Sequence, residues 1–132
     1  MSGEKFSGLK DIELVSAALD SKLGFSRAHA IVALVDRALA KPDLLGDACK
    51  AISVDRRVGF HKGSPLGWFG ADRIFLSGKK DAIRALLNEM ELWDSSEQED
   101  LVRHWSGSRG LDALTHELVE AYGWVPRYNL RG

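Results

Sequence analysis

Apolar residues recur every three or four positions along almost the whole chain, which is the spacing of amphipathic α-helices. Residues that end helices interrupt this pattern at short intervals, among them Gly24, Pro42, Gly78 and Gly123. Short turns make successive helices pack as antiparallel neighbours. We therefore expect an all-α fold, a compact bundle of about seven short helices joined by short turns. A short stack of helical hairpins, with a repeat-like organisation, is the alternative.

Seven apolar stripes mark the predicted helices and the side chains expected to face the core. The clearest holds Ile83, Leu86, Leu87 and Met90 at positions i, i+3, i+4 and i+7. The other stripes are Leu9, Ile12, Val15, Leu19 and Leu23; Ile31, Leu34, Val35, Ala38 and Leu39; Leu45, Ala48, Cys49 and Ile52; Leu66, Trp68, Phe69, Ala71, Ile74 and Phe75; Leu101, Val102 and Trp105; and Leu111, Leu114, Leu118 and Tyr122.

Capping residues place the starts of two of these helices. Ser64-Pro65 is typical of an N-cap followed by a first-turn proline, and Ser95 with Gln98 has the spacing of a capping box. The helix after Pro65 is apolar nearly all round, so it is predicted to be the central element of the core. Between it and the preceding helix, Val54, Val58 and Phe60 allow a short extended segment.

Two segments of the sequence resemble each other at a constant offset, which is the signature of a helical repeat. Helix pairs would then begin near Leu9, Asp43 and Lys79. Any two amphipathic helices with an acidic first turn share such a pattern, so both interpretations stay open. The matched residues are Asp43, Leu45, Ala48, Cys49 and Ile52 in the first segment and Asp81, Ile83, Leu86, Leu87 and Met90 in the second.

No change in composition marks a domain boundary, and we expect residues 1–132 to form a single helical domain. Residues 1–8 are expected to be a flexible start, and residues 124–132 a tail docked through Trp124 and Tyr128. The single cysteine excludes an internal disulfide and a cysteine-based zinc site. No apolar run reaches the ~18 residues that span a bilayer, and no signal peptide is recognisable, so a cytoplasmic protein without a membrane partner is expected.

Charge is distributed unevenly along a chain whose net charge is only −1. The segment 54–84 is basic and the segment 88–104 is acidic. Exposed basic side chains hold acidic partners or phosphates. The predicted partner-binding residues are Arg56, Arg57, His61, Lys62, Lys79, Lys80 and Arg84. The alternative is that Arg56 and Arg57 pair within the molecule, with Asp55 or with the acidic segment.

Patterns for catalysis, metals and cofactors are absent from the sequence. The glycines of segment 59–70 lack the Gly-Lys-Ser/Thr order of a phosphate loop, and Gly67 and Gly70 are interpreted as points of close helix packing. Asp100 with His104, and His116 with Glu120, have i, i+4 spacing but match no metal motif and are interpreted as surface pairs. We therefore predict no catalytic residue, no metal and no cofactor.

The function predicted from the sequence is that of a non-catalytic protein-interaction module of the adaptor, inhibitor or immunity type. It would bind another protein through charge complementarity. Two alternatives stay open. The first is a nucleic-acid-binding protein that uses the basic segment 54–84. The second is a small enzyme that acts on a phosphorylated ligand at the glycine-rich segment 59–70.

Overall fold

The structure, a computed structural model, describes residues 6–58 and 64–128. In these two ranges it contains seven α-helices and no strand, which confirms the predicted all-α class. Short 3₁₀ turns lie at Ser21–Leu23, Pro42–Leu44 and Gly107–Arg109. The helices are α1 (Asp11–Leu19), α2 (Ser26–Ala40), α3 (Leu45–Val54), α4 (Gly67–Ser77), α5 (Lys80–Met90), α6 (Ser95–Ser106) and α7 (Leu111–Tyr122).

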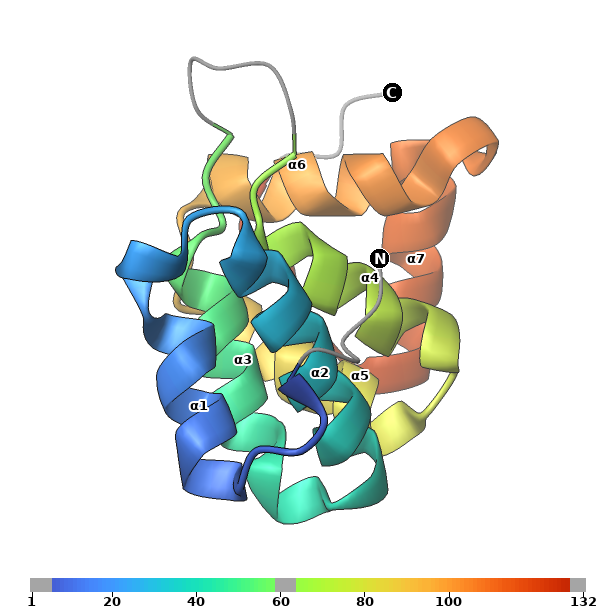
Figure 1. Cartoon of the computed structure of the whole chain (residues 1–132). Coiled ribbons are helices and arrows are strands. Elements are labelled where there is room, and N and C mark those ends of the chain that lie inside the picture. Colours follow the sequence, from blue (N-terminus) through green and yellow to red (C-terminus); the bar gives the residue numbers. More distant parts are fainter. Residues whose placement is uncertain (1–5, 59–63, 129–132) are drawn as a thin grey trace.

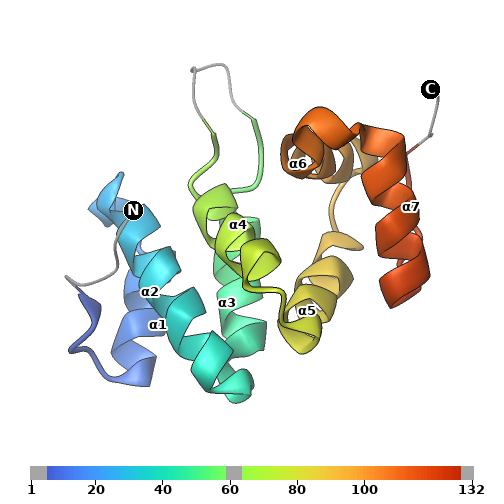
Figure 2. The same cartoon turned by 90° about the vertical axis from the view of Figure 1, so that its right-hand side faces the viewer.

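Helices α1, α3 and α5 lie in one row and α2 and α4 in a second, and α6 lies across the end of these rows with α7 beside it (Figures 1 and 2). In the first row α1 contacts α3, and α3 contacts α5. In the second row α2 contacts α4, and side chains of α6 lie against α4. α7 packs on α6 at the end of the array. The helices therefore form a compact arrangement in which most of them contact several neighbours, as predicted.

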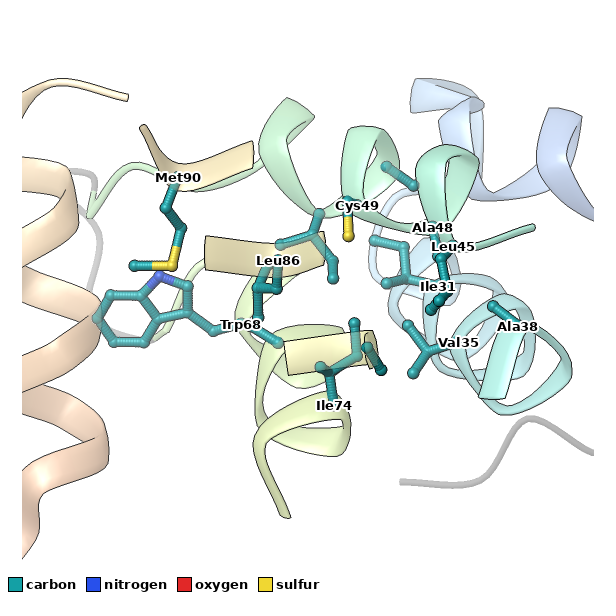
Figure 3. Packing of buried hydrophobic residues seen from close by; sticks show 14 of the residues in the cluster. Ile31, Val35, Ala38, Leu45, Ala48, Cys49, Trp68, Ile74, Leu86 and Met90 are labelled. Carbon is teal, nitrogen blue, oxygen red and sulfur yellow. The ribbon is translucent and has the colours of Figure 1, made fainter. Parts of the chain in front are cut away.

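The core runs between the two rows (Figure 3) and contains most of the predicted stripe residues. On α5, Ile83, Leu86, Leu87 and Met90 are all buried, as predicted. Trp93 in the following turn is fully buried, and its indole N–H donates to the Ser53 hydroxyl over 2.8 Å. Side chains of α2, α3, α4 and α5 therefore meet in one continuous apolar cluster.

The predicted stripe of α1 was wrong in part. Leu14 and Ala18 are fully buried, whereas Ile12 is 78% exposed and Leu19 is also exposed. The small Ala18 side chain suits the contact of α1 with α2 and α3. The helix also ends at Leu19, because Asp20 is extended and its carboxylate accepts a hydrogen bond from the Lys22 N–H.

Two predicted helix starts also differ from the structure. α4 begins at Gly67, after Ser64-Pro65. α6 is capped by Asp94 in place of Ser95, and the Glu97 carboxylate accepts a hydrogen bond from the Asp94 N–H. An aspartate is as good a cap as a serine, and the reciprocal bond from Glu97 favours the earlier start.

The segment that was predicted to be extended is not a strand where the structure describes it. Val54 is the last residue of α3, and Val54 and Val58 are both exposed. Phe60 lies outside the described residues.

Two glycines of α4 allow other elements to approach closely, as the sequence predicted. A Cβ atom at Gly67 would lie 2.2 Å from the Ile52 carbonyl oxygen. A Cβ atom at Gly70 would lie 2.6 Å from Cγ2 of Ile31. The Gly67 N–H also donates to the Asp55 carbonyl over 3.0 Å, which joins the start of α4 to the end of α3.

The described parts of both ends of the chain lie against the helices. Phe6 is buried, and Arg37 of α2 donates to the carbonyl oxygens of Ser7 and Leu9. Phe6 and Ser7 belong to residues 1–8, which were predicted to be a flexible start. Trp124 and Tyr128 are buried, and residues 129–132 of the predicted tail lie outside the described residues. Within the described ranges, no helix has both the length and the apolar character that crossing a membrane requires.

Candidate functional site

The predicted partner-binding residues fall into two groups at different ends of α4. Arg56 and Arg57 follow α3, close to the start of α4, whereas Lys79 and Lys80 lie beyond its last residue and Arg84 is exposed on α5. An α-helix rises 1.5 Å per residue, so the 11 residues of α4 separate the groups by about 16 Å. The other two, His61 and Lys62, lie outside the described residues. The described residues therefore form no single basic patch.

Arg56 and Arg57 both pair with Glu97 of α6, which is the intramolecular alternative that the sequence left open. The Nε atoms of Arg56 and Arg57 lie 2.9 Å and 2.6 Å from the two Glu97 carboxylate oxygens. Arg56 also donates to the Ser53 carbonyl and lies over the Trp93 ring. These contacts give Arg56 a structural role, while Arg57 keeps a side chain that is 73% exposed and available to a partner.

The electrostatics of Glu97 show how firmly this contact is held. Its side chain is only 7% exposed. Burial opposes ionisation, but hydrogen bonds from the Asp94 N–H, Arg56 and Arg57 together hold the pKa of Glu97 below its usual range. Glu97 is therefore a buried anion with matched donors, and it ties α6 to the end of α3.

Lys79 and Lys80 line a pocket of about 310 Å³ at the opposite end of α4. Its walls are mainly apolar and come from α2, α3 and α5. Lys79 donates from Nζ to the Leu39 carbonyl over 2.8 Å, and the Asp81 carboxylate shares the rim. The positive charge around this pocket is therefore smaller than the two lysines alone would give.

A third cluster, which the sequence did not predict, lies where α4 meets α6. The Asp72 carboxylate accepts a hydrogen bond from Nε1 of Trp105 at 2.9 Å. Nε2 of His104 lies 3.1 Å and 3.0 Å from the two Asp72 oxygens. His104 was paired with Asp100 in the sequence, but its partner is Asp72, on the neighbouring helix.

Aromatic rings hold the same junction. The His104 ring stacks on Trp68 with centroids 4.8 Å apart. The Trp105 ring stacks on Phe75 with centroids 4.6 Å apart and planes within 4° of each other. Stacked aromatic pairs contribute about 0.5–1.5 kcal/mol beyond the area that they bury. The rings and the hydrogen bonds to Asp72 together fix the position of α6 on α4.

Beside these rings lies a pocket of about 200 Å³. Leu76 stands at its edge with 81% of the residue exposed, and Phe69, seven positions earlier on the same face of α4, is also exposed. We define the α4–α6 surface as Phe69, Asp72, Phe75, Leu76, His104 and Trp105. The sequence carried one signal of it: α4 is more apolar than its neighbours can cover.

The charge on the α4–α6 surface resides in Asp72. On the neighbouring helix α2, the Asp36 carboxylate pairs with both Nε and a terminal nitrogen of Arg73, at 2.8 Å and 3.0 Å. The partners of Asp72 differ, because an indole is neutral and an imidazole is charged only when protonated. When His104 is neutral, the partners of Asp72 therefore carry no positive charge to compensate it, whereas Asp36 is paired with a guanidinium.

Two other residues that the sequence singled out, Cys49 and His116, lie away from the α4–α6 surface. Burial, together with the nearby Glu89, raises the pKa of the Cys49 thiol to about 12. His116 pairs with Glu120 on the exposed side of α7, and the described part of the chain holds no group of three potential metal ligands. Comparisons with protein-family models, curated proteins and solved structures find no match to this chain. Among the described residues, the α4–α6 surface combines an exposed apolar side chain, a pocket and a carboxylate.

Proposed function

We propose that this protein is a non-catalytic protein-interaction module, of the adaptor, inhibitor or immunity type, and that it binds its partner through the α4–α6 surface. The observation that carries the proposal is Leu76, which is almost fully exposed beside an aromatic pocket. Residues that dominate protein interfaces are enriched in tryptophan, tyrosine and arginine and lie in well-packed pockets, and the pocket beside Leu76 is lined by Trp105. The single cysteine of the sequence supports a cytoplasmic setting, since small secreted domains are commonly rich in disulfides.

The pocket is suited to binding because its walls are already held in place. Phe75 and Trp105 fix each other by stacking, and Asp72 holds Trp105 by its indole N–H. A preformed site loses little side-chain entropy when a partner binds. Burial of an exposed leucine adds about 1.5–3 kcal/mol to the free energy of association. Burial of Leu76 would thus contribute binding free energy, and the stacked rings would hold the pocket in a fixed shape.

Arg57 is proposed as a second contact. Its side chain is largely exposed although its Nε donates to Glu97. Charges at the edge of an interface mainly raise the association rate. Arg57 would therefore steer an acidic part of the partner, while the α4–α6 surface provides the buried contact. Lys80 and Arg84 are exposed and stay predicted contacts of the same kind.

The test compares two leucines that are similarly exposed in different places. Leu76→Glu places a charge in the α4–α6 surface, and Leu92→Glu places one in the turn after α5, where Leu92 is 76% exposed. Wild type and both variants are immobilised on a resin and incubated with a lysate of the native host. The captured proteins are quantified by mass spectrometry. A protein retained by wild type and Leu92→Glu is then purified and titrated by calorimetry. We expect Leu76→Glu to weaken its binding at least about tenfold, or about 1.4 kcal/mol.

Thermal unfolding of each variant verifies that it is folded. Equal binding by wild type and a folded Leu76→Glu variant would contradict the assignment of the α4–α6 surface. Arg57→Glu is tested in the same way. If it abolishes binding while Leu76→Glu does not, the partner binds the basic end of the molecule instead.

A further inference from the structure

We infer that the pocket of the α4–α6 surface takes one arginine side chain of the partner, whose guanidinium pairs with Asp72 and stacks on the partly buried aromatic rings that line the pocket. This inference rests on the proposed function, because it takes the partner to be a protein. Three properties of the pocket carry it: its size, the hydrogen-bonding capacity of Asp72 and the flat rings beside that carboxylate.

The size of the pocket favours a single side chain. Its volume is about 200 Å³. Pockets for metabolites and drug-sized ligands commonly measure about 300–1,000 Å³ and enclose most of the ligand. This pocket is smaller and lies at the surface between two helices. It therefore suits a side chain that projects from a partner and stays anchored there by its backbone.

The Asp72 carboxylate has room for another donor. Two oxygens offer about four acceptor positions. Trp105 donates to Oδ1, and one nitrogen of His104 is shared between Oδ1 and Oδ2. The side chain of Asp72 is 34% exposed, so a donor from outside can reach it. Hydrogen bonds between a guanidinium and a carboxylate are charge-assisted and about twice as strong as neutral ones.

The neighbouring cations do not fill this position. Arg73 is adjacent in sequence, but its guanidinium binds both oxygens of Asp36 on α2. Arg103 of α6 pairs with Glu99, one turn earlier on its own helix. His104 faces Asp72 and contributes positive charge only when it is protonated. The charge that a partner meets in the pocket is thus that of the Asp72 carboxylate.

The rings explain why arginine fits better than lysine. A guanidinium is planar and stacks on aromatic faces while its N–H groups point outward in a fork. The indole of Trp105 touches Asp72 through its N–H, so its ring and the carboxylate are neighbours that one guanidinium can contact together. Lysine would offer a point charge without a flat face. Leu76, at the same edge, would cover the methylene groups of the arginine or an apolar residue next to it.

The experiment uses two small probes on the full chain. Protein labelled with ¹⁵N is titrated with N-acetyl-arginine amide and, separately, with N-acetyl-citrulline amide, which has the same shape without the charge. The signal followed is the indole N–H of Trp105, assigned from its absence in Trp105→Phe. We expect a saturable shift with the arginine probe, with a dissociation constant in the millimolar range, and no saturable shift with the citrulline probe.

Two aspartate variants make the test specific. Asp72→Asn should abolish the response to the arginine probe, whereas Asp36→Asn, which removes the other carboxylate at the α4 surface, should preserve it. Equal responses to arginine and citrulline, no response to either, or a full response in Asp72→Asn would each overturn the inference. The comparison of the two probes on wild type does not use Asp72→Asn, so it stands even if that variant does not fold.

The outcomes also separate this inference from the proposed function. If Leu76→Glu weakens partner binding but the arginine probe gives no response, the α4–α6 surface binds a protein by another chemistry and the inference fails alone. If the probe binds Asp72 while Leu76→Glu leaves partner binding intact, the pocket is a cation site and the proposed surface is wrong.

Discussion

Glu97 of α6 makes the polar contacts that join α6 to the residues just after α3. It accepts hydrogen bonds from the Asp94 N–H and from both arginines that follow α3. One carboxylate thus caps a helix and closes a contact between segments about 40 positions apart in sequence. Removing one member of a buried ion pair leaves the others without a partner, which is the costly way to break such a contact.

We therefore predict that Glu97→Gln lowers the free energy of unfolding by about 1–3 kcal/mol at neutral pH, since charged hydrogen bonds are lost at a buried site. The folded-state pKa of Glu97 is lowered, so its contribution is fully present above the pKa of the unfolded chain, about 4.3, and is lost as the pH falls through the folded value. Urea unfolding of wild type and variant should thus differ most at neutral pH and converge as the pH falls through the folded-state pKa.

The control for this measurement is Glu120→Gln. Glu120 pairs with His116 on an exposed face of α7, and exposed pairs contribute roughly 0–1 kcal/mol. A difference between wild type and Glu97→Gln that stays constant from pH 7 to pH 3 would contradict the role of ionised Glu97.

Cys49 allows a second prediction for a single residue. Its side chain is buried in α3, and burial together with Glu89 raises the pKa of the thiol to about 12. Only the thiolate reacts with disulfide reagents, so native Cys49 should be labelled at least about 100-fold more slowly than Cys49 in denaturant. The labelling rate with a coloured disulfide reagent measures this ratio. Equal rates would place the thiol at the surface and contradict the packing of α3.

At the scale of the elements, three glycine-to-alanine substitutions should change stability in opposite directions. Gly67→Ala and Gly70→Ala place a methyl group against Ile52 and Ile31, so each should destabilise by about 1–3 kcal/mol or more. Gly46 lies in α3, and nothing surrounds the position of its Cβ. Gly46→Ala should therefore stabilise by about 0.5–1 kcal/mol through helix propensity. Denaturant midpoints of the three variants test this pattern, and a stabilised Gly67→Ala would contradict the close approach of α3 and α4.

The helices differ in how well their buried faces can be predicted. α5 has one apolar stripe and charged residues elsewhere, so only one face can point inward, and the prediction was confirmed. α1 has apolar residues on two sides, and its contacts with α2 and α3 decide that Leu14 is buried and Ile12 exposed. The spacing of apolar residues shows which faces of a helix are apolar, but it does not show which of these faces another helix will cover.

The α4–α6 surface was beyond prediction for the same physical reason. Asp72 and His104 lie 32 positions apart in sequence, and only the packing of α6 on α4 brings them together. Within one helix, the spacing of Asp100 and His104 was the pairing visible in the sequence. The pairing of Arg56 and Arg57 with the acidic segment was foreseen as an alternative, because opposite charges within one small protein commonly meet.

At the scale of the whole molecule, the two rows imply that stability is unevenly distributed. α2, α3 and α4 each contact neighbours on more than one side, whereas α6 and α7 contact mainly each other. In arrays of this kind, terminal units open more readily than central ones. We predict slower amide hydrogen exchange in α2–α4 than in α6 and α7, measured by mass spectrometry of peptides.

The Asp72→Ala variant tests how strongly α6 and α7 are held to the rest of the molecule through α4. It removes the hydrogen bonds from Trp105 and His104. The free energy of opening α6 and α7 should fall by about 1 kcal/mol, while exchange in α1 and α2 stays unchanged. Uniformly faster exchange in all helices would show instead that the chain opens as one cooperative unit.

The hydrogen bond between the Gly67 N–H and the Asp55 carbonyl also bears on protein engineering. It joins the end of α3 to the start of α4, and the nearby residues Val58 and Ser64 are exposed. Lengthening a connection whose ends are already closed costs only about 0.6 kcal/mol for each doubling of its length. A reporter peptide or a whole inserted domain can therefore be accommodated between these two residues while the packing of α3 on α4 is retained.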